Sequence, residues 1–495
     1  MGRTLIEELA PLARLRWLQL FVLAALLVVV GAVAFQLKFS VIDLDVWWQL
    51  KVGDWIVQHA AFPHTGILSR SAAHRPWAAY SWGYEVLLSR SYAWFGLKGV
   101  GLYGTLLTVM VAFSVYGMAR RLSGKFWPAS LLAFACCYAF LFDIMPRPVF
   151  FSIVLLCVTL ALLLEAQHSS RVQKLYWLPL VFVLWANLHI QFIYGLAVVG
   201  LFVACSLAQK LAARFRVAPG YLAGAQLPAG KLLAVFGACA LATLIGPYTY
   251  HLYGVIFSYS RSQLIYSMIR ELQPLSFRAY ENYVELLLAG AAFFAVAWRK
   301  KVDLFQLALL AMASVVAFRT MRDSWFLCVA AAACIADMEL APEARERQES
   351  AVELAGVFAT VAVGLLLFAP GTNFTTRGLD RAISANFPVD AVNFVRRNRI
   401  PGPLYNNFDW GGFLTWYLPD YPVVIDGRTD LYGEELDKLL LETQNGDLSY
   451  KDNPYLNQAG LVLLRKRDGL VAALELDPRF RKVYEDQLAT VFVRQ

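Results

Sequence analysis

Charged residues are scarce in this chain of 495 residues. Asp, Glu, Lys and Arg together make up 16% of it, whereas an average soluble domain carries about 25%. Hydrophobic residues make up 59%, and apolar runs of about 20 residues, each long enough to cross a bilayer, recur along the first three quarters. These features exclude an ordinary soluble domain and predict a polytopic α-helical membrane protein.

The sequence also lacks the signatures of several kinds of site. Its seven cysteines all lie inside apolar runs without metal-ligand spacing, so neither disulfides nor a zinc–thiolate site is expected. A nucleophile elbow, a zincin helix, a Walker phosphate loop and a dinucleotide fingerprint are all absent. The basic residues behind the net charge of +8 form short clusters between apolar runs, which argues against a nucleic-acid groove.

Hydropathy predicts about eleven membrane helices. An arginine-rich start before "GAVAF" is reminiscent of a cleaved signal peptide, but the first apolar run is long enough to favour an uncleaved helix. The predicted helices lie near residues 17–37, 99–119, 126–142, 148–166, 174–189, 191–211, 231–247, 282–298, 303–318, 322–340 and 351–369.

The distribution of basic residues predicts which connections face the cytoplasm. Basic clusters such as "ARRLSGK", "QKLAARFR" and "WRKK" fall in alternate connections, and by the positive-inside rule these connections and the N-terminus are cytoplasmic. The remaining connections, and the tail after residue 370, are then external. The rule therefore gathers one set of polar residues on the external face: Asp43, Asp45, Arg147, His189, His251, Arg319 and Arg322.

The first external connection, residues 38–98, is expected to be structured. Residues 46–59 and 80–96 each have helical amphipathic spacing, and six of the 14 tryptophans fall in this segment. Because Trp favours the headgroup layer, we expect two helices that lie on the outer membrane interface.

The tail has a different pattern from the preceding 370 residues. "PLYNNF", "YPVVIDG", "AGLVLLRK" and "ATVFVRQ" are short runs typical of strands, and segments with helical spacing lie between them. The sequence therefore predicts a membrane-embedded domain over 1–370 and a small external α/β domain over 371–495.

Asp43 and Asp45 stand at the outer end of the first predicted helix. In an extended segment, residues two apart project to the same side, so both carboxylates would face one cleft. Such a pair can supply a general base and a group that holds a cation. The structural alternative is that Asp45 caps the helix beginning at Val46 and that Asp43 is a solvated charge.

An Asp-x-Asp at this place, followed by two interfacial helices in the first external loop, resembles the C-type glycosyltransferase superfamily. "DVWWQLKVGDWIVQHAAFPHTGILSRS" and "WAAYSWGYEVLL" are also similar to uncharacterised bacterial proteins of this layout. The resemblance covers roughly residues 15–340. It implies a multi-spanning enzyme that takes a sugar from a polyprenyl-phosphate carrier, with Asp43 or Asp45 as the base that activates the acceptor hydroxyl. It leaves open whether the other aspartate binds a divalent metal, Mg²⁺ or Mn²⁺.

Glycosyl transfer from a phosphate also needs cations at the leaving group. Arginine suits phosphate because its planar fork binds two oxygens. Arg147, Arg319 and Arg322 lie at external turns between predicted spans, and His189 lies in a tight turn near the membrane surface. Alternatively, the arginines snorkel at helix ends, with Asp143 and Asp323 as counter-charges, and His189 satisfies backbone groups.

Four further residues are candidates for the acceptor cleft: Asn187, His251, Asp426 and Arg428. Asp426 and Arg428 follow a predicted strand, and sites in open α/β sheets lie at such strand ends. A local ion pair between them is the structural alternative.

We therefore expect a transferase at the outer leaflet of a bacterial plasma membrane, with an external glycan, lipid or protein as acceptor. Three rival functions remain at this stage. A lipid-linked glycan polymerase or ligase would depend on the arginines but not on the aspartates. A transporter would need charges near mid-membrane, which are few here. A non-catalytic scaffold would use the tail to bind a partner.

Overall fold

The structure is a computed structural model. It describes residues 39–140, 145, 147–215, 222–223, 227–261, 269–299, 301–338 and 375–495, together with Arg16 and Gln19. The predicted helices at 17–37 and 351–369 lie outside the described residues. Most described residues are helical, and the chain forms two compact units.

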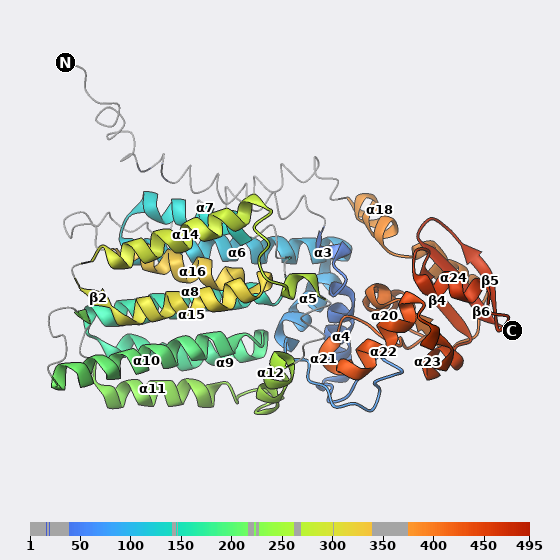
Figure 1. The fold of residues 1–495 in the computed structure, drawn as a ribbon, viewed down its shortest axis with the longest axis horizontal. Helices are drawn as coiled ribbons and strands as arrows, with labels where there is room; N and C mark the ends of the chain where they lie inside the picture. Colours follow the sequence, from blue (N-terminus) through green and yellow to red (C-terminus); the bar gives the residue numbers. More distant parts are fainter. Residues whose placement is uncertain are drawn as a thin grey trace, which may run out of the picture. The chain divides into compact units, whose positions relative to one another are not determined.

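The first unit, called the helical unit here, takes in Gly104–Gly246 and the described part of Arg270–Thr372. Its helices run side by side in Figure 1. They are α6 (Leu97–Ser123), which begins in the other unit, α7 (Phe126–Phe140), α8 (Val149–Ser169), α9 (Leu178–Leu188), α10 (Phe192–Arg214), α11 (Ala229–Ala242), α14 (Tyr280–Ala297), α15 (Leu304–Arg319) and α16 (Ser324–Ala336). Short 3-10 turns η1 (Val172–Trp177), η2 (Arg270–Leu272) and η3 (Met321–Asp323) and a two-residue pairing of β1 (Leu222–Ala223) with β2 (Val302–Asp303) connect them.

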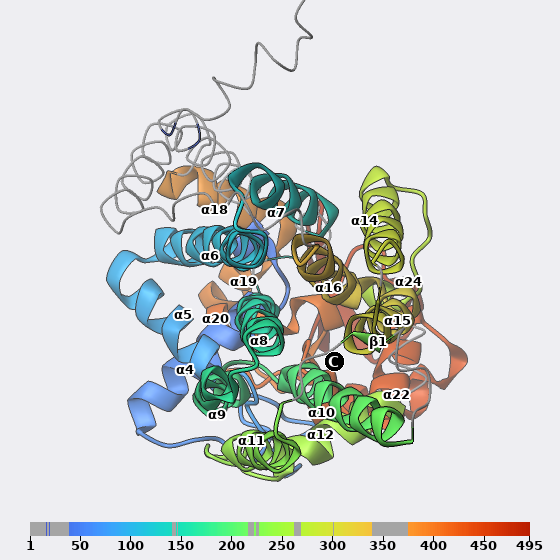
Figure 2. The same cartoon turned by 90° about the vertical axis from the view of Figure 1, so that its left-hand side faces the viewer.

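These helices lie where the apolar runs of the sequence predict them. Their ends follow local chemistry. Asp303 caps α15 by accepting a hydrogen bond from the backbone N–H of Gln306, and Ser170, directly after α8, is in the left-handed conformation (φ 53°). Helix α8 packs against α9, α10 and α16, as the view along the helices shows (Figure 2). All seven cysteines are buried in these helices.

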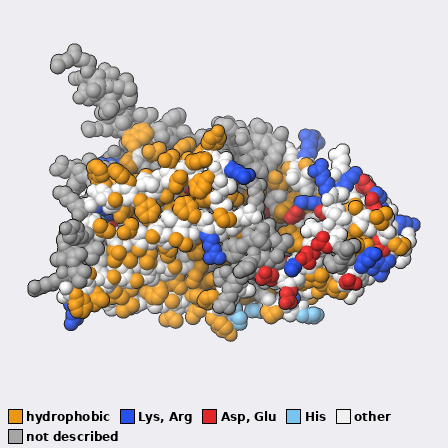
Figure 3. All heavy atoms as spheres, in the orientation of Figure 1, with side chains coloured by type: hydrophobic (Ala, Val, Ile, Leu, Met, Phe, Trp, Pro, Cys, Tyr) orange, Lys and Arg blue, Asp and Glu red, His pale blue; other side chains and the backbone are white. Residues whose placement is uncertain are grey.

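Three helices of the described part are long and apolar enough to cross a membrane: α6, α8 and α10. Hydrophobic side chains cover most of the visible face of the helical unit, whereas charged side chains are frequent over the tail (Figure 3). A multi-pass membrane protein is the consequence. The total of eleven spans and the assignment of sides stay predictions.

The second unit, called the mixed unit, combines three separate stretches: the described parts of Leu37–Tyr103, Pro247–Ile269 and Asn373–Gln495. The first connection, residues 38–98, therefore folds together with the tail. It contributes α3 (Phe39–Ile42), α4 (Val46–His59) and α5 (Trp82–Phe95), and the middle stretch contributes α12 (His251–Arg261). The two helices predicted in this connection are present, and their position on a membrane interface stays a prediction.

The tail forms a four-stranded sheet with helices around it. The strand order is β3 (Leu404–Asn406), β4 (Leu461–Arg465), β6 (Ala489–Arg494) and β5 (Phe480–Glu485). Strand β3 runs parallel to β4, and the other pairs are antiparallel. The helical segments of the tail are α18 (Thr376–Asn386), α19 (Val389–Arg397), η5 (Phe408–Trp410), α20 (Gly411–Tyr417), α21 (Thr429–Tyr432), α22 (Glu434–Asn445), η6 (Leu448–Asp452), α23 (Pro454–Asn457) and α24 (Gly469–Glu475).

One predicted strand of the tail is wrong. "YPVVIDG" (421–427) does not join the sheet; Val423 instead forms an isolated parallel bridge with Ser69 of the first connection. Its backbone groups are satisfied there, because the N–H of Val423 donates to the carbonyl of Leu68 and the N–H of Arg70 donates to the carbonyl of Val423. A strand-like pattern thus serves to join two distant stretches.

Aromatic packing holds the first connection to the tail within the mixed unit. Trp47 of α4 is fully buried, with edge contacts to Phe387, Phe413 and Tyr417 at centroid distances of 5.2–6.1 Å. Buried aromatic side chains of this size dominate core energetics. Helix α4 is therefore part of the core that the tail completes.

Candidate functional site

Asp43 and Asp45 lie in the turn between α3 and α4. Asp43 is 4% exposed, and its Oδ1 accepts a hydrogen bond from the backbone N–H of Asp45 at 2.9 Å. This is the geometry of an Asx turn. The backbone of Asp45 is helical (φ −86°, ψ −25°), so the expected extended segment does not form, and Asp43 is not a solvated charge.

The carboxylate of Asp45 contacts both α4 and the tail. The indole Nε1 of Trp48 donates to its Oδ1 at 3.0 Å. Asp45 stands at the N-cap position of α4, yet its side chain makes no capping hydrogen bond to the first backbone amides of that helix, all of which are described. On the tail side, a Cβ added to Gly427 would lie 2.2 Å from the same Oδ1. The missing side chain at Gly427 therefore makes room for this carboxylate.

A divalent metal at this pair would have few protein ligands. One oxygen of each aspartate already accepts a hydrogen bond. Within the described ranges, no three His, Cys, Asp or Glu side chains are grouped to hold a metal ion. Structural metal sites usually have more protein ligands than this, and metal binding by Asp43 and Asp45 stays a prediction.

Asp426 and Arg428 form a buried ion pair just after the bridge at Val423. The Nη2 of Arg428 donates to Asp426 Oδ2 at 2.7 Å and its Nε donates to Oδ1 at 2.9 Å. Both side chains are 0% exposed. The Nη1 of Arg428 also donates to the carbonyl of Ile67 at 2.8 Å, and its guanidinium lies 4.9 Å from the ring of Trp77. The local ion pair is thus present and fastens the first connection to the tail; a contact with an acceptor stays a prediction.

A buried carboxyl of α5 belongs to the same region. Glu85 is 1% exposed, and its Oε2 has no hydrogen-bond partner among the described residues. Burial raises its pKa to about 8, a shift that Arg428 opposes and Asp430 adds to. Burial likewise raises the pKa of Asp430 to about 6 and that of Asp437 to about 8.

These shifts predict that the mixed unit loses stability as pH rises. The carboxyl of Glu85 would titrate near 4.5 in the unfolded chain, so between about pH 4.5 and 8 the folded state binds more protons than the unfolded state. The free energy of unfolding therefore falls across this range. We expect Glu85→Gln to reduce the fall in the melting temperature between pH 5 and pH 8, in part only, because Asp430 and Asp437 titrate in the same range.

Thermal unfolding of the purified chain in nanodiscs at both pH values measures this effect. Glu435→Gln, at an exposed position of α22, is the matched control and should leave the pH dependence unchanged. An identical pH dependence in Glu85→Gln and the parent chain would contradict the assignment.

In the helical unit, two of the predicted phosphate-binding residues meet at one carboxylate. The Nη1 of Arg147 lies 3.1 Å from Oε1 of Glu271, and the Nη1 of Arg322 lies 3.6 Å from the same oxygen. Burial alone would raise the pKa of Glu271, but Arg322 and Arg147 hold it below its usual value. The side chains of all three are partly exposed, at 19%, 27% and 31% for Arg147, Arg322 and Glu271. The cluster therefore holds an anionic group between two guanidinium groups at an accessible place.

His189 lies deeper than the sequence suggests. It is 3% exposed, and its Nδ1 lies 2.8 Å from the hydroxyl of Ser152, which also accepts a hydrogen bond from Trp185 Nε1 at 2.7 Å. The buried Ser152 hydroxyl thus joins α8 to α9, through Trp185, and to His189, the residue that directly follows α9. This placement suits a positioning role better than direct contact with a phosphate.

Asp323 is bonded by neutral donors. Its Oδ1 accepts from Gln191 Nε2 at 2.7 Å, and its Oδ2 accepts from the hydroxyls of Tyr194 and Thr320 at 2.9 and 2.7 Å. These contacts tie the start of α10 to η3, the turn that carries Arg322. The carboxylate of Asp323 thereby fixes the turn.

The remaining candidates, Arg319, Asn187 and His251, differ in their exposure and in the groups that they contact. Arg319 is exposed at the end of α15. Asn187 donates to the carbonyls of Val183 and Ile245, both at 2.7 Å, and so ties the end of α9 to the turn after α11. His251, in the mixed unit, is exposed and stacks on Tyr250 at 4.2 Å. None of these placements tests a role in transfer.

Sequence reasoning missed Glu271 and Glu85. Glu271 is one of only two acidic residues in the 248–281 connection, and that scarcity was a usable signal. Glu85 carries a weaker signal, a single carboxylate near the start of an amphipathic stretch. The sequence did not show that Glu271 pairs with Arg147 and Arg322, or that Glu85 lies near Arg428.

Comparisons with known proteins give a fold but no close relative. No protein-family model matches the chain, and no curated protein matches it. Solved structures do. The archaeal oligosaccharyltransferase AglB from Archaeoglobus fulgidus, in complex with an inhibitory peptide and a dolichol-phosphate, matches with a TM-score of 0.50 at 12% identity, over 93% of this chain and 70% of that one.

The apo form of the A. fulgidus enzyme gives a TM-score of 0.52 at 12% identity, over 91% of this chain and 70% of that one. ArnT from Cupriavidus metallidurans, bound to undecaprenyl phosphate, has a TM-score of 0.47 at 14% identity, over 94% and 97% of the two chains. The oligosaccharyltransferase is a C-type glycosyltransferase. At this identity the likeness establishes a shared fold, which agrees with the resemblance seen in the sequence.

Proposed function

We propose that this chain, which has the fold of the C-type glycosyltransferases, is a membrane glycosyltransferase with a polyprenyl-phosphate or polyprenyl-diphosphate sugar as donor. The observation that carries the proposal is the shared fold over 93% of the chain with an oligosaccharyltransferase whose structure holds dolichol-phosphate. Fold alone does not fix a reaction. Glycosyl transfer from a lipid phosphate needs a base for the acceptor proton and cations for the leaving phosphate. Asp43 and Asp45 are the candidates for the base, and Arg147 and Arg322 are the candidates for the cations.

The proposed reaction breaks one bond and forms one. An acceptor hydroxyl attacks the anomeric carbon, the bond between that carbon and the phosphate oxygen breaks, and the lipid phosphate leaves with the electron pair. The hydroxyl proton goes to a carboxylate, for which Asp45 or Asp43 is the candidate. Positive charge develops on the sugar and negative charge on the phosphate.

Arg147 and Arg322 are the candidates for holding the leaving phosphate. Both already bind the carboxylate of Glu271, a smaller oxyanion than phosphate. Charge-assisted hydrogen bonds from a guanidinium to a phosphate are stronger than neutral ones. Arg319 would add a contact, and His189 would act by positioning the turn through Ser152.

The proposal includes the outer leaflet of a bacterial plasma membrane as the place of reaction, and a glycan, lipid or protein as the acceptor. The external side follows from the positions of the basic clusters in the sequence. Asn187, His251, Asp426 and Arg428 remain acceptor-side candidates, and a divalent metal at the aspartates remains an option for members of this fold.

Radiolabelled sugar transfer tests the proposal. Membranes from cells that produce the chain, and from cells with an empty vector, are supplied with a panel of polyprenyl-phosphate and polyprenyl-diphosphate sugars. We expect label to enter lipid or polymer only where the chain is present. Label that enters equally in both membranes for every donor would overturn the proposal.

Substituting the arginines tests the phosphate assignment. We expect Arg147→Ala and Arg322→Ala each to lower kcat/KM for the donor by about 10- to 100-fold, since a hydrogen bond to a charged group contributes about 1.5–3 kcal/mol. Arg278→Ala, an exposed arginine of the 248–281 connection that carries Glu271, is the control and should be near the parent value. Unchanged kinetics in both Arg147→Ala and Arg322→Ala would remove these residues from the donor site.

A second candidate function has one observation in its favour. The Arg147–Glu271–Arg322 cluster is built without either aspartate, as expected for a lipid-linked glycan polymerase or ligase that needs no carboxylate base. That enzyme would lose activity in the arginine variants and keep it in Asp43→Asn and Asp45→Asn.

A further inference from the structure

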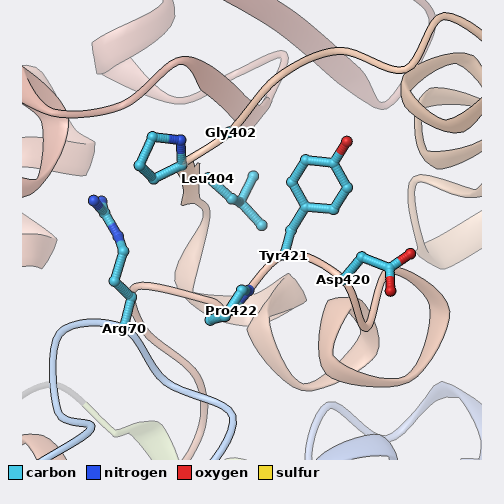
Figure 4. Close-up of a pocket in the computed structure, with 7 residues that line it drawn as sticks. Arg70, Gly402, Leu404, Asp420, Tyr421 and Pro422 are labelled. Atoms are coloured by element: carbon cyan, nitrogen blue, oxygen red, sulfur yellow. The ribbon is translucent and has the colours of Figure 1, made fainter.

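The mixed unit contains a pocket that neither the aspartates nor the arginines of the proposed reaction line. Its volume is about 360 Å³, within the range of small-molecule sites. The first connection supplies Arg70, and the tail supplies the rest of the lining used here: Gly402, Leu404, Asp420, Tyr421 and Pro422. Figure 4 shows Arg70 on one side, Tyr421 and Asp420 on the other, and Leu404 between them.

The ring of Tyr421 is held in place and lines the pocket. Its hydroxyl donates to the carbonyl of Ile400 at 2.6 Å, so the polar end of the side chain is already bonded. A Cβ added to Gly402 would lie 3.5 and 3.7 Å from two ring carbons, in ordinary van der Waals contact. Glycine at this position therefore leaves a methyl-sized space beside the ring, at the edge of the pocket.

The polar groups of the pocket carry opposite charges. Arg70 is fixed by hydrogen bonds from Nη2 to the carbonyl of Tyr455 at 3.0 Å and from Nη1 to Gln458 Oε1 at 3.4 Å. Its Nε is buried with no partner within the described part of the chain. Asp420 is exposed at the other side of the pocket. A donor and an acceptor thus flank an aromatic face and an apolar floor of Leu404 and Pro422.

We propose that this pocket binds one sugar ring of the acceptor, a proposal that rests on the proposed function. A pyranose has a C–H face that packs on the negative face of an aromatic ring and a rim of hydroxyls that both donate and accept. An anion attracted by Arg70 would be repelled by Asp420, and a cation attracted by Asp420 would be repelled by Arg70, because like charges placed together cost binding energy. A neutral ligand with one apolar face and hydroxyl groups can contact the aromatic ring, the apolar floor, Arg70 and Asp420 together.

Binding of free glycosides to the full chain in nanodiscs tests this pocket. The probes are the methyl glycosides of glucose, galactose, mannose and N-acetylglucosamine, followed by saturation-transfer NMR. We expect saturable binding of at least one of them. Tyr421→Leu should weaken it at least tenfold, whereas Tyr421→Phe keeps the ring and should keep the binding.

Two further variants separate the pocket from general damage. Gly402→Leu fills the space beside the ring and should abolish binding, and Asp420→Ala should weaken it by about three- to tenfold, the effect of one lost hydrogen bond. Asp452→Asn, at an exposed position of the same unit, should bind like the parent chain. Absence of saturable binding for every glycoside, or binding unchanged in Gly402→Leu, would overturn the proposal.

The transfer assay distinguishes this failure from failure of the proposed function. Sugar transfer with an unchanged acceptor KM in Gly402→Leu would support the proposed transferase activity and exclude the pocket from acceptor binding. Glycoside binding that Gly402→Leu abolishes, in a chain that transfers no sugar, would leave the pocket standing as a carbohydrate site and remove the transferase.

Discussion

Replacing Asp45 by asparagine is expected to lower the rate of sugar transfer by about 10²- to 10⁴-fold, the range that a positioned general base contributes. Asparagine keeps the shape of the side chain and its contact with the indole of Trp48, but it cannot accept the proton of the acceptor hydroxyl. The loss should therefore fall on kcat more than on the donor KM. Transfer in membranes, with the donor found in the panel, measures it.

Asp43→Asn and Asp54→Asn complete this experiment. Asp43 positions the turn through the backbone N–H of Asp45, so its variant should also lose activity if it is the base or if it orients the base. Asp54 lies on α4, where its carboxylate accepts a hydrogen bond from Gln58. Asp54→Asn should transfer sugar at the parent rate. Full activity in both Asp43→Asn and Asp45→Asn would remove the aspartates from the mechanism and favour the arginine-dependent polymerase or ligase.

Gly427→Ala offers an independent approach to the same carboxylate. The added methyl group would lie 2.2 Å from Asp45 Oδ1 and 3.2 Å from Trp48 Nε1, so the carboxylate must move while its chemistry stays intact. We expect a loss of kcat in a chain that still folds, because the displaced atom is the end of a side chain. Such a result would show that the position of Asp45, and not only its charge, matters.

The largest loss of stability is expected from Arg428→Leu. Both members of the Asp426–Arg428 pair are buried, and removing one partner of such a pair typically costs about 3–5 kcal/mol, because the other charge stays buried and unpaired. The contacts with Ile67 and with the ring of Trp77 are lost as well. The apparent melting temperature in nanodiscs should therefore drop by several degrees.

The control for this prediction is an ion pair of the same type at the surface. Arg465 pairs with Asp409 at 2.6 Å, but its side chain is 40% exposed, so Arg465→Leu should cost about 1 kcal/mol or less. The double variant Asp426→Leu with Arg428→Met removes both buried charges and should melt above Arg428→Leu. Equal melting temperatures for Arg428→Leu and Arg465→Leu would contradict the view that the buried pair fastens the first connection.

The helices of the helical unit could be predicted because hydropathy is local information. The apolar runs at 148–166 and 191–211, for example, coincide with α8 and α10. The strand β5 was missed, because "FRKVYE" alternates only weakly and owes its conformation to pairing with β6. Segment 421–427 was misassigned, since its true partner, Ser69, lies far away in the sequence.

The candidate sites show the same contrast between what local sequence predicts and what depends on contacts between distant segments. Asp43, Asp45, Arg147 and Arg322 were identified as candidates from residue type and from position at the ends of apolar runs. Their partners were not, because Glu271 and Gly427 come from other segments that only the fold brings near. Local pattern thus finds charged groups, and tertiary structure decides which of them act on one another.

The assembly of the mixed unit from Leu37–Tyr103, Pro247–Ile269 and Asn373–Gln495 has a consequence for biosynthesis. The first stretch leaves the ribosome about 270 residues before the last one begins. At about 5–20 residues per second, translation of that interval takes tens of seconds. During this time Trp47 lacks Phe387, Phe413 and Tyr417, the aromatic partners that cover it in the finished fold. We therefore expect the nascent first connection to need a chaperone or the lipid surface, and ribosomes stalled before residue 373 should leave this stretch open to proteolysis.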